Sequence, residues 1–222
     1  MELPATSAPA GGWLRSASRR IRFMWLTKMV GTTVIMGGFF VAYFWLLNHP
    51  RHAVTTIPRI FLDRVVGFRP EALALYVSLW FYIPIAPSLL DDRRRLLSYG
   101  AATIALSLAG FAVFILWPTA VPIPEVNWSD HPSMSWLKRV DASGNAFPSL
   151  HVAFAVFTAA WIERVLREMG TGRLVRALNW LWCLGIVYST IATRQHVALD
   201  AVFGAVLGAV AAALHMRALR RP

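Results

Sequence analysis

The chain has 222 residues, of which 57% are of hydrophobic types and 15% are charged. Soluble domains carry about 25% charged residues, so this composition excludes an ordinary water-soluble globular fold. The formal net charge of +11 would suit a nucleic-acid-binding protein, but the basic residues lie in short segments between apolar runs rather than on one soluble face, which argues against nucleic acid as a partner.

Six runs of 16 or more residues contain little or no charge, and each is long enough to cross a bilayer. Backbone amides cannot stay unpaired in hydrocarbon, so such runs form helices or strands of a closed barrel. The runs are continuously apolar rather than alternating, which predicts helices. We therefore expect an all-α, polytopic membrane protein, a six-transmembrane-helix bundle that forms a single membrane domain over residues 1–222. The runs are 29–47, 72–90, 96–117, 146–162, 177–193 and 197–214.

The segment before the first run is basic. Arg15, Arg19, Arg20 and Arg22 precede the apolar residues, as in a secretory signal. The run of about twenty residues is too long for a signal, however, and no A-x-A cleavage site follows it. We expect a retained first helix and a cytoplasmic N-terminal segment, residues 1–28.

Lys and Arg are unevenly divided between the segments that separate the runs. Fifteen of the 22 lie in segments on the side of the N-terminus, and seven lie on the other side. The positive-inside rule therefore places both termini in the cytoplasm. We expect a multi-pass protein of the bacterial inner (plasma) membrane. The single cysteine, Cys183, lies in the fifth run, so no intrachain disulfide can form.

Two segments on the expected outer side differ from the rest. The longest is the outer loop 118–145, whose prolines and tryptophans suit a rim over a site at the headgroup region. Between the first two runs, apolar residues recur at helical spacing among charged ones, which is typical of a short interfacial helix. A plain connecting loop fits the same segment. Its apolar residues are Ile57, Ile60, Phe61, Val65 and Phe68.

Small residues recur in the sixth run. Gly204 and Gly208 form a GxxxG pair that Ala212 extends. Such a pair permits close packing of helices in a membrane, so we interpret it structurally and assign it no chemistry.

Three ionisable residues inside the runs carry the functional prediction, because such residues are costly in a membrane. His151 lies near the start of the fourth run, and His196 and Asp200 lie at the start of the sixth. Two crossings separate these starts, so both lie on one side of the membrane, which the charge distribution makes the outer side. His196 and Asp200 are four residues apart and share a helix face. Asp200 can then hold one ring nitrogen of His196 and leave the other free to attack.

Two neighbouring residues suit phosphate binding. The planar guanidinium of Arg194 can fork onto phosphate oxygens at the edge of the bilayer. Ser149 lies in the run F-P-S-L-H at 147–151, which opens the fourth helix, where free backbone N–H groups and a hydroxyl favour an anion. His151 then stands beside the phosphate and can protonate a departing oxygen.

Each of these residues alone has a simpler explanation. A single interfacial histidine is more often a hydrogen-bonded packing residue, and Arg194 alone can be a snorkelling anchor. Their convergence on one face of a nearly uncharged bundle favours catalysis. Two histidines and a carboxylate are also a metal ligand set in principle, but we expect no metal and no cofactor.

The sequences P-S-L-H at 148–151 and R-Q-H-V-A-L-D at 194–200 resemble the second and third motifs of the type 2 phosphatidic acid phosphatase superfamily. The resemblance covers roughly residues 118–208, with the catalytic motifs within 146–208. It implies a phosphohistidine mechanism, in which His196 attacks phosphorus, Asp200 orients it and His151 protonates the leaving group. Arg194 and Ser149 would hold phosphate oxygens.

The chain departs from the family pattern at three points. Leu150 replaces the glycine of P-S-G-H, and the spacing between Arg194 and His196 is shortened. The first motif, K-x6-R-P, is missing, and Lys138 and Arg139 are the candidates to replace its cations. The forms P-S-L-H and R-Q-H-x3-D look closer to the branch that contains inositol phosphorylceramide synthase and sphingomyelin synthase-like proteins. Members of that branch pass a phosphorylated headgroup to an alcohol instead of water.

The sequence thus predicts a membrane phosphatase that hydrolyses lipid phosphates or polyprenyl pyrophosphates at the outer face through a phosphohistidine intermediate. One alternative is a lipid headgroup phosphotransferase, inositol phosphorylceramide synthase-like, which needs a second lipid acceptor. Another is a non-catalytic lipid-phosphate binder or transporter. In each case the expected partners are a lipid phosphate and the membrane.

Overall fold

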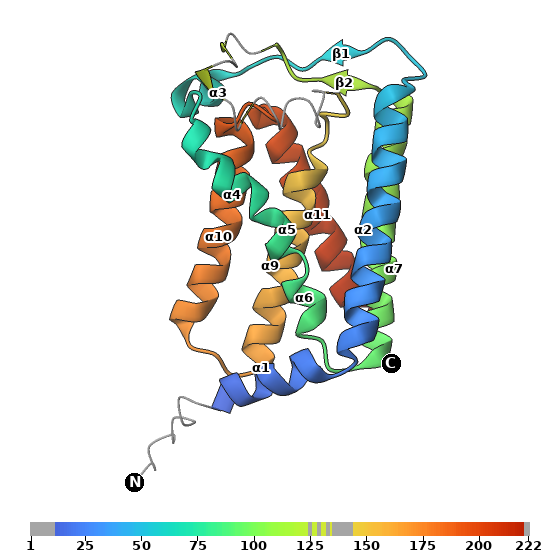
Figure 1. Cartoon of the computed structure of the whole chain (residues 1–222), viewed down its shortest axis with the longest axis vertical. Helices are drawn as coiled ribbons and strands as arrows, with labels where there is room; N and C mark the ends of the chain where they lie inside the picture. The colour runs from blue at the N-terminus through green and yellow to red at the C-terminus, as the bar shows by residue number, and fades with distance from the viewer. Residues whose placement is uncertain (1–11, 124–125, 128–129, 132–133, 135–143, 220–222) are drawn as a thin grey trace.

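The computed structural model describes residues 12–123, 126–127, 130–131, 134 and 144–219. Long helices run side by side in a bundle (Figure 1). At one end α1 (Gly12–Arg22) lies across the bundle. At the other end β1 (Thr55–Thr56) pairs in parallel with β2 (Thr119–Ala120). We call these the α1 end and the strand end.

Four helices in the described residues are long and apolar enough to cross a membrane. They match the first, third, fifth and sixth predicted runs and confirm a mostly helical membrane protein. Asp92 begins the second of these helices by accepting the backbone N–H groups of Arg94 and Arg95 at 3.2 Å. The four helices are α2 (Trp25–Asn48), α7 (Arg93–Leu116), α10 (Arg173–Ala192) and α11 (Ala198–Ala218).

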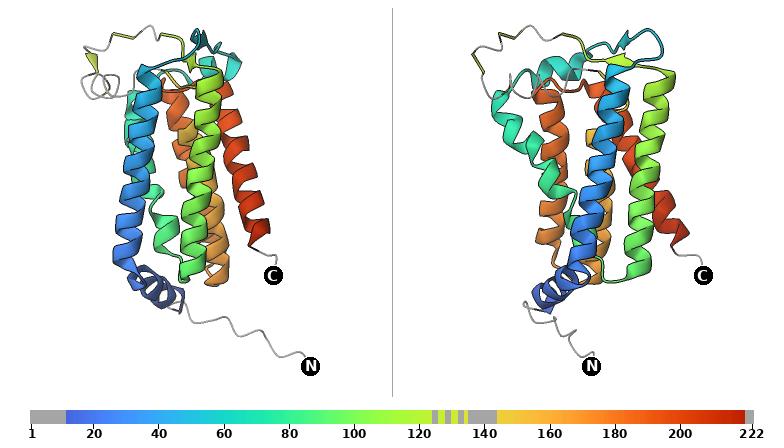
Figure 2. Two further views of the ribbon diagram at one scale, coloured as in Figure 1. Left: turned by 90° about the vertical axis from the view of Figure 1, so that its right-hand side faces the viewer. Right: turned by 45° about the vertical axis from the view of Figure 1, so that its right-hand side comes forward.

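The second predicted run, 72–90, differs from a continuous helix. Pro84 and Pro87 lack the backbone N–H that an unbroken helix needs, and the Ser78 hydroxyl donates to the Leu75 carbonyl at 2.6 Å. The segment still extends from the strand end to the α1 end (Figure 2). It consists of η1 (Pro70–Ala72), α4 (Leu73–Val77), α5 (Leu79–Tyr82) and α6 (Ile85–Ser88).

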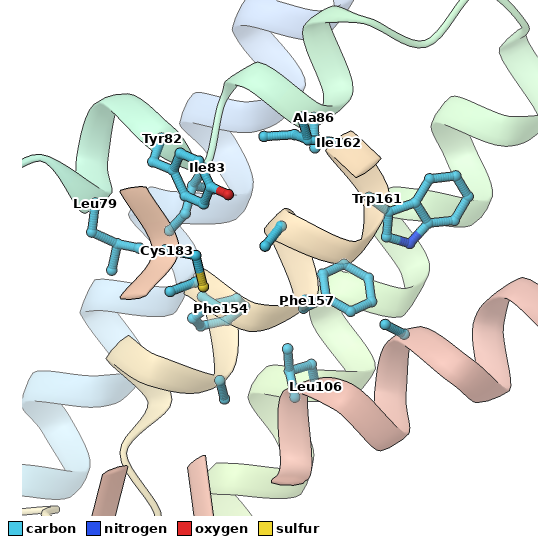
Figure 3. Close-up of a cluster of buried hydrophobic side chains, with 14 of the residues drawn as sticks. Leu79, Tyr82, Ile83, Ala86, Leu106, Phe154, Phe157, Trp161, Ile162 and Cys183 are labelled. Atoms are coloured by element: carbon cyan, nitrogen blue, oxygen red, sulfur yellow. The ribbon is translucent and has the colours of Figure 1, made fainter. Parts of the chain in front are cut away.

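The fourth predicted run forms the central helix, α9 (Leu150–Glu168), which begins four residues later and ends six residues later than expected. Fourteen of its nineteen residues are buried. Four of its last six residues are charged, so by composition it is less apolar than the other long helices. Figure 3 shows Phe154, Phe157 and Trp161 of α9 in the core beside side chains of the second run and α10.

The predicted interfacial helix is shorter than the pattern suggested. Only Phe61–Val66 is helical, as α3, and Gly67 follows it with a φ of 66°. Phe61 and Val65 are exposed, at 78% and 61% of their surfaces. Asp63, in contrast, is completely buried, so α3 turns this carboxylate toward the bundle while Phe61 and Val65 point away from it.

The predicted close packing at the GxxxG pair is confirmed. A Cβ atom added to Gly204 would collide with the backbone oxygen of Ser149, and one added to Gly208 would collide with that of Ala153. At Gly204 and Gly208, α11 therefore rests directly on the backbone at the start of α9. Helices can approach this closely only where the contact residues lack side chains.

Gly208→Ala should lower the free energy of unfolding by about 1–3 kcal/mol, because its new methyl group meets backbone atoms that cannot move aside. Thermal unfolding in detergent measures this loss. Gly38→Ala is the matched control, since a Cβ atom there meets nothing within 4 Å and the gain in helix propensity is the same. Equal effects of the two substitutions would contradict the packing described here.

Candidate active site

The starts of α9 and α11 meet at the strand end of the bundle. The backbone N–H of Ser149 donates to the carbonyl of Asp200 at 3.0 Å, and Gly204 packs on Ser149. The sequence predicted that these two starts lie on the same side of the membrane. The backbone hydrogen bond joins them directly, and so brings the second and third motifs together.

His196 and Asp200 lie next to each other, as their spacing predicted. The Nδ1 atom of His196 is 3.5 Å from Oδ2 of Asp200. The α11 helix begins only at Ala198, so His196 lies in the turn before the helix rather than on its face. The same Asp200 oxygen accepts the backbone N–H of Val197 at 3.1 Å. A carboxylate so placed both caps the helix and faces the imidazole.

His151 is held by aromatic side chains of the second run. Its imidazole stacks on the Tyr76 ring with centroids 4.2 Å apart and an interplanar angle of 16°. The Trp80 ring approaches it edge-on at 5.9 Å. In the described part of the chain, Nε2 of His151 is buried and has no hydrogen-bond partner. This nitrogen is therefore available to a ligand.

Both histidines line one cavity of about 240 Å³. Asn145 is the other strongly polar residue of its wall, and the Asn145 amide donates to the Tyr43 carbonyl at 3.3 Å. Most of the wall is aromatic, so an apolar chain fits beside the two imidazoles. The aromatic side chains are Phe39, Phe40, Tyr43, Phe44, Tyr76, Trp80 and Phe154. Sequence reasoning missed Tyr76 and Trp80, although their spacing of four residues in an apolar run is a helical signal.

Arg194 lies in the turn between α10 and α11, with a φ of 58°, a conformation unusual for a residue with a side chain. Its guanidinium Nη1 donates to the backbone carbonyl of Asp63 at 2.9 Å. Burial lowers the pKa of Arg194, and the nearby Arg59 lowers it further, while Asp63 opposes the change. The side chain thus reaches toward α3 and is not part of the cavity wall.

Ser149 is the N-cap of α9. Its Oγ accepts the backbone N–H of Val152 at 3.2 Å, and the residue is completely buried. Pro148 therefore precedes the cap, outside the first helical turn. Lys138 and Arg139, the predicted substitutes for the missing first motif, lie outside the described residues.

A metal site is an alternative that the sequence left open. Among the described residues, no three His, Cys, Asp or Glu side chains form a group that could hold a metal ion. His151 and His196 line the cavity, whereas Asp200 lies beside His196 and is not part of the cavity wall.

The sequence profile described as PAP2 superfamily matches residues 95–221, more than half of the chain. The chain belongs to the PAP2 superfamily. The matched region contains α7 from residue 95 onward and all of α9, α10 and α11, and with them both histidine motifs. The superfamily generally comprises phosphatases and phosphotransferases, so this protein is an enzyme of that broad type.

Together with the four apolar helices, membership of the superfamily indicates an integral membrane protein. No curated protein and no solved structure gives a significant match.

Ser149→Ala should lower the free energy of unfolding by about 1 kcal/mol, whereas Ser149→Gly should lower it by only roughly a few tenths, because glycine is tolerated at an N-cap. Thermal unfolding of the two variants measures the difference. Both variants remove the hydroxyl group, so any loss of activity that they share reports on the hydroxyl itself. Equal destabilisation by alanine and glycine would show that the cap contributes nothing.

Proposed function

We propose that this member of the PAP2 superfamily is a membrane phosphatase that hydrolyses lipid phosphates or polyprenyl pyrophosphates. The observation that carries the proposal is the shared cavity: His151 and His196 line it among apolar and aromatic side chains. A ligand with an apolar chain and an anionic head complements such a wall.

In the proposed reaction, Nε2 of His196 attacks phosphorus while Asp200 holds the proton on Nδ1. The bond from phosphorus to the leaving oxygen breaks, and His151 donates a proton to that oxygen. The product is a phosphohistidine and a free lipid alcohol or lipid monophosphate. Water then attacks the phosphohistidine, His151 accepts its proton, and inorganic phosphate leaves. The distance of 3.5 Å between His196 and Asp200 is long, as is common before a ligand tightens a catalytic pair.

The phosphate oxygens need cationic or N–H donors. Ser149 lies two residues before His151, and we assign its hydroxyl to this task together with Arg194. Lys138 and Arg139 are the candidates for the cation of the missing first motif.

We further propose that the chain crosses the membrane six times, since α9 and the broken segment of α4, α5 and α6 also extend from one end of the bundle to the other (Figures 1 and 2). The excess of Lys and Arg then places the α1 end and both termini in the cytoplasm of a bacterial inner membrane. On this topology, the histidines face the outer side and the substrate enters laterally from the outer leaflet.

The form of the two motifs favours a second candidate, a lipid headgroup phosphotransferase of the inositol phosphorylceramide synthase-like type. The first half of its reaction is the same, since His196 again receives the phosphorylated group. A lipid hydroxyl would replace water in the second half. A second lipid acceptor must then reach the phosphohistidine.

A turnover screen separates these functions. The purified protein is incubated with labelled phosphatidic acid, phosphatidylglycerol phosphate or undecaprenyl pyrophosphate, with and without diacylglycerol or ceramide. We expect free phosphate, inhibition by vanadate and no effect of chelators. A new phospholipid that requires the acceptor would identify a transferase instead. Binding without any turnover would leave only a binder or transporter and would overturn the enzymatic proposal.

His196→Ala should abolish turnover and phosphoenzyme trapping, because no other group in the cavity wall is placed to attack with Asp200 behind it. Binding of the lipid phosphate should persist, since the apolar wall is unchanged. His215→Ala is the matched control: this histidine lies at the α1 end of α11, where it contacts Ser98 Oγ at 2.7 Å. Turnover that survives His196→Ala would eliminate the phosphohistidine.

His151→Ala should lower the rate by about 10²–10⁴-fold for a lipid alcohol as leaving group, because a general acid contributes an acceleration of this size. A lipid p-nitrophenyl phosphate analogue needs no protonation on departure, so its first step should lose much less. Rapid-quench measurement of phosphoenzyme formation compares the two substrates. Equal losses with both would remove the assignment of His151 as the acid.

A further inference from the structure

A buried carboxylate outside the known motifs contacts the turn that carries His196. Asp63, in the six-residue helix α3, has no exposed surface. Its Oδ1 accepts the backbone N–H of Ala198 at 2.8 Å, and its Oδ2 accepts that of Ile60 at 2.8 Å. Its backbone carbonyl accepts Nη1 of Arg194 at 2.9 Å. The contacts to Ala198 and Arg194 join positions more than 130 residues apart in the sequence.

The two long-range contacts of Asp63 lie on either side of His196 in the sequence. Arg194 lies two residues before His196, and Ala198 lies two residues after it. The backbone of the turn also bonds within itself, because the Thr190 carbonyl accepts the N–H groups of both Gln195 and His196, at 3.1 and 3.0 Å. Asp63 thus contacts the chain on both sides of the proposed nucleophile from outside α10 and α11.

The geometry also gives a reason for the buried charge. The Asp63 carboxylate stands at the N-terminus of the 21-residue helix α11, where the unpaired N–H groups and the helix dipole stabilise a negative charge. Asp200 accepts the backbone N–H of Val197, and Asp63 accepts that of Ala198. Two carboxylates therefore share the helix start, and Asp200 alone faces the imidazole. The positive φ of Arg194 requires surrounding contacts to persist, and the Asp63 carbonyl supplies one of them.

We propose that Asp63 is a positioning residue for His196: it holds the turn from Arg194 to Ala198 so that the imidazole faces the phosphorus atom of the substrate. This inference rests on the proposed function of His196 as nucleophile. Asp63 touches neither the cavity nor the reacting atoms. Its loss should therefore slow the chemical step and leave binding of the substrate nearly unchanged.

The test compares Asp63→Ala with Asp92→Ala. Asp92 is a matched control, because it too accepts two backbone N–H groups at a helix N-terminus but lies at the α1 end. With a lipid phosphate that the wild type hydrolyses, Asp63→Ala should lower kcat on the order of 100-fold, the cost of a displacement of about 1 Å in the reacting geometry. KM should stay close to the wild-type value, and Asp92→Ala should leave kcat unchanged. Equal kcat values for the two variants would overturn the proposal.

Asp63→Asn keeps the test decisive if the alanine variant does not fold. The amide retains one acceptor oxygen for Ala198 but loses the second oxygen and the charge, so its kcat should fall between those of the wild type and Asp63→Ala. A wild-type kcat in a folded Asp63→Asn, with Asp63→Ala unfolded in a thermal scan, would reduce Asp63 to a structural residue and contradict the proposal.

A second measurement does not depend on turnover. In protein with ¹⁵N-labelled histidine, the resonances of His196 are assigned with His196→Gln. Asp63→Asn should shift these imidazole resonances, and Asp92→Ala should not. If the wild type hydrolyses no lipid phosphate, the proposed function fails while these spectra still decide whether Asp63 positions the ring. Unchanged His196 resonances in Asp63→Asn would show that it does not.

Discussion

The close approach of α11 to α9 is the contact on which the rest of the site depends. Gly204 and Gly208 leave no side chain between the two helices, so α11 rests on the backbone at Ser149 and Ala153. This contact allows the Ser149 N–H to reach the Asp200 carbonyl. With a larger residue at Gly204, the two helix starts would separate, and the histidines of the two motifs would no longer line one cavity.

Charged side chains at the α1 end form ion pairs, most of which join different elements, and such pairing lowers the cost of placing charge in a largely apolar bundle. At the α1 end, Glu163 of α9 binds Arg167 and Arg176 with distances of 2.6 Å. Glu168 binds Arg95 at 2.9 Å, and Arg20 of α1 binds Asp91 at the same distance. Arg20 also lies 4.0 Å from Glu168, so these ion pairs join α1, α7, α9 and α10. They explain why the central helix carries charge in its last turns although it lies inside the bundle.

The strand end is organised differently. Three of its charged residues, Asp63, Arg194 and Asp200, form hydrogen bonds in and around the turn before α11. Asp63 and Asp200 accept successive N–H groups of that helix start, and Arg194 reaches back to α3. The same end holds the aromatic side chains that surround His151. The second run breaks at Ser78, between α4 and α5, and these two short helices present Tyr76 and Trp80 to that imidazole. The side chains that form the cavity wall therefore also hold His151 in place beside His196.

The sequence by itself determined the membrane character, four of the six membrane helices that it predicted, the meeting of the two motifs at one end, the proximity of His196 to Asp200 and the packing role of Gly204 and Gly208. These features depend on composition, on the number of crossings or on spacing within one segment. Tertiary structure alone decided that Tyr76 stacks on His151 and that Asp63 reaches Ala198. Such contacts join segments far apart along the chain, and no local periodicity encodes which residue of one helix will face a given residue of another. Only the packing of the folded bundle fixes them.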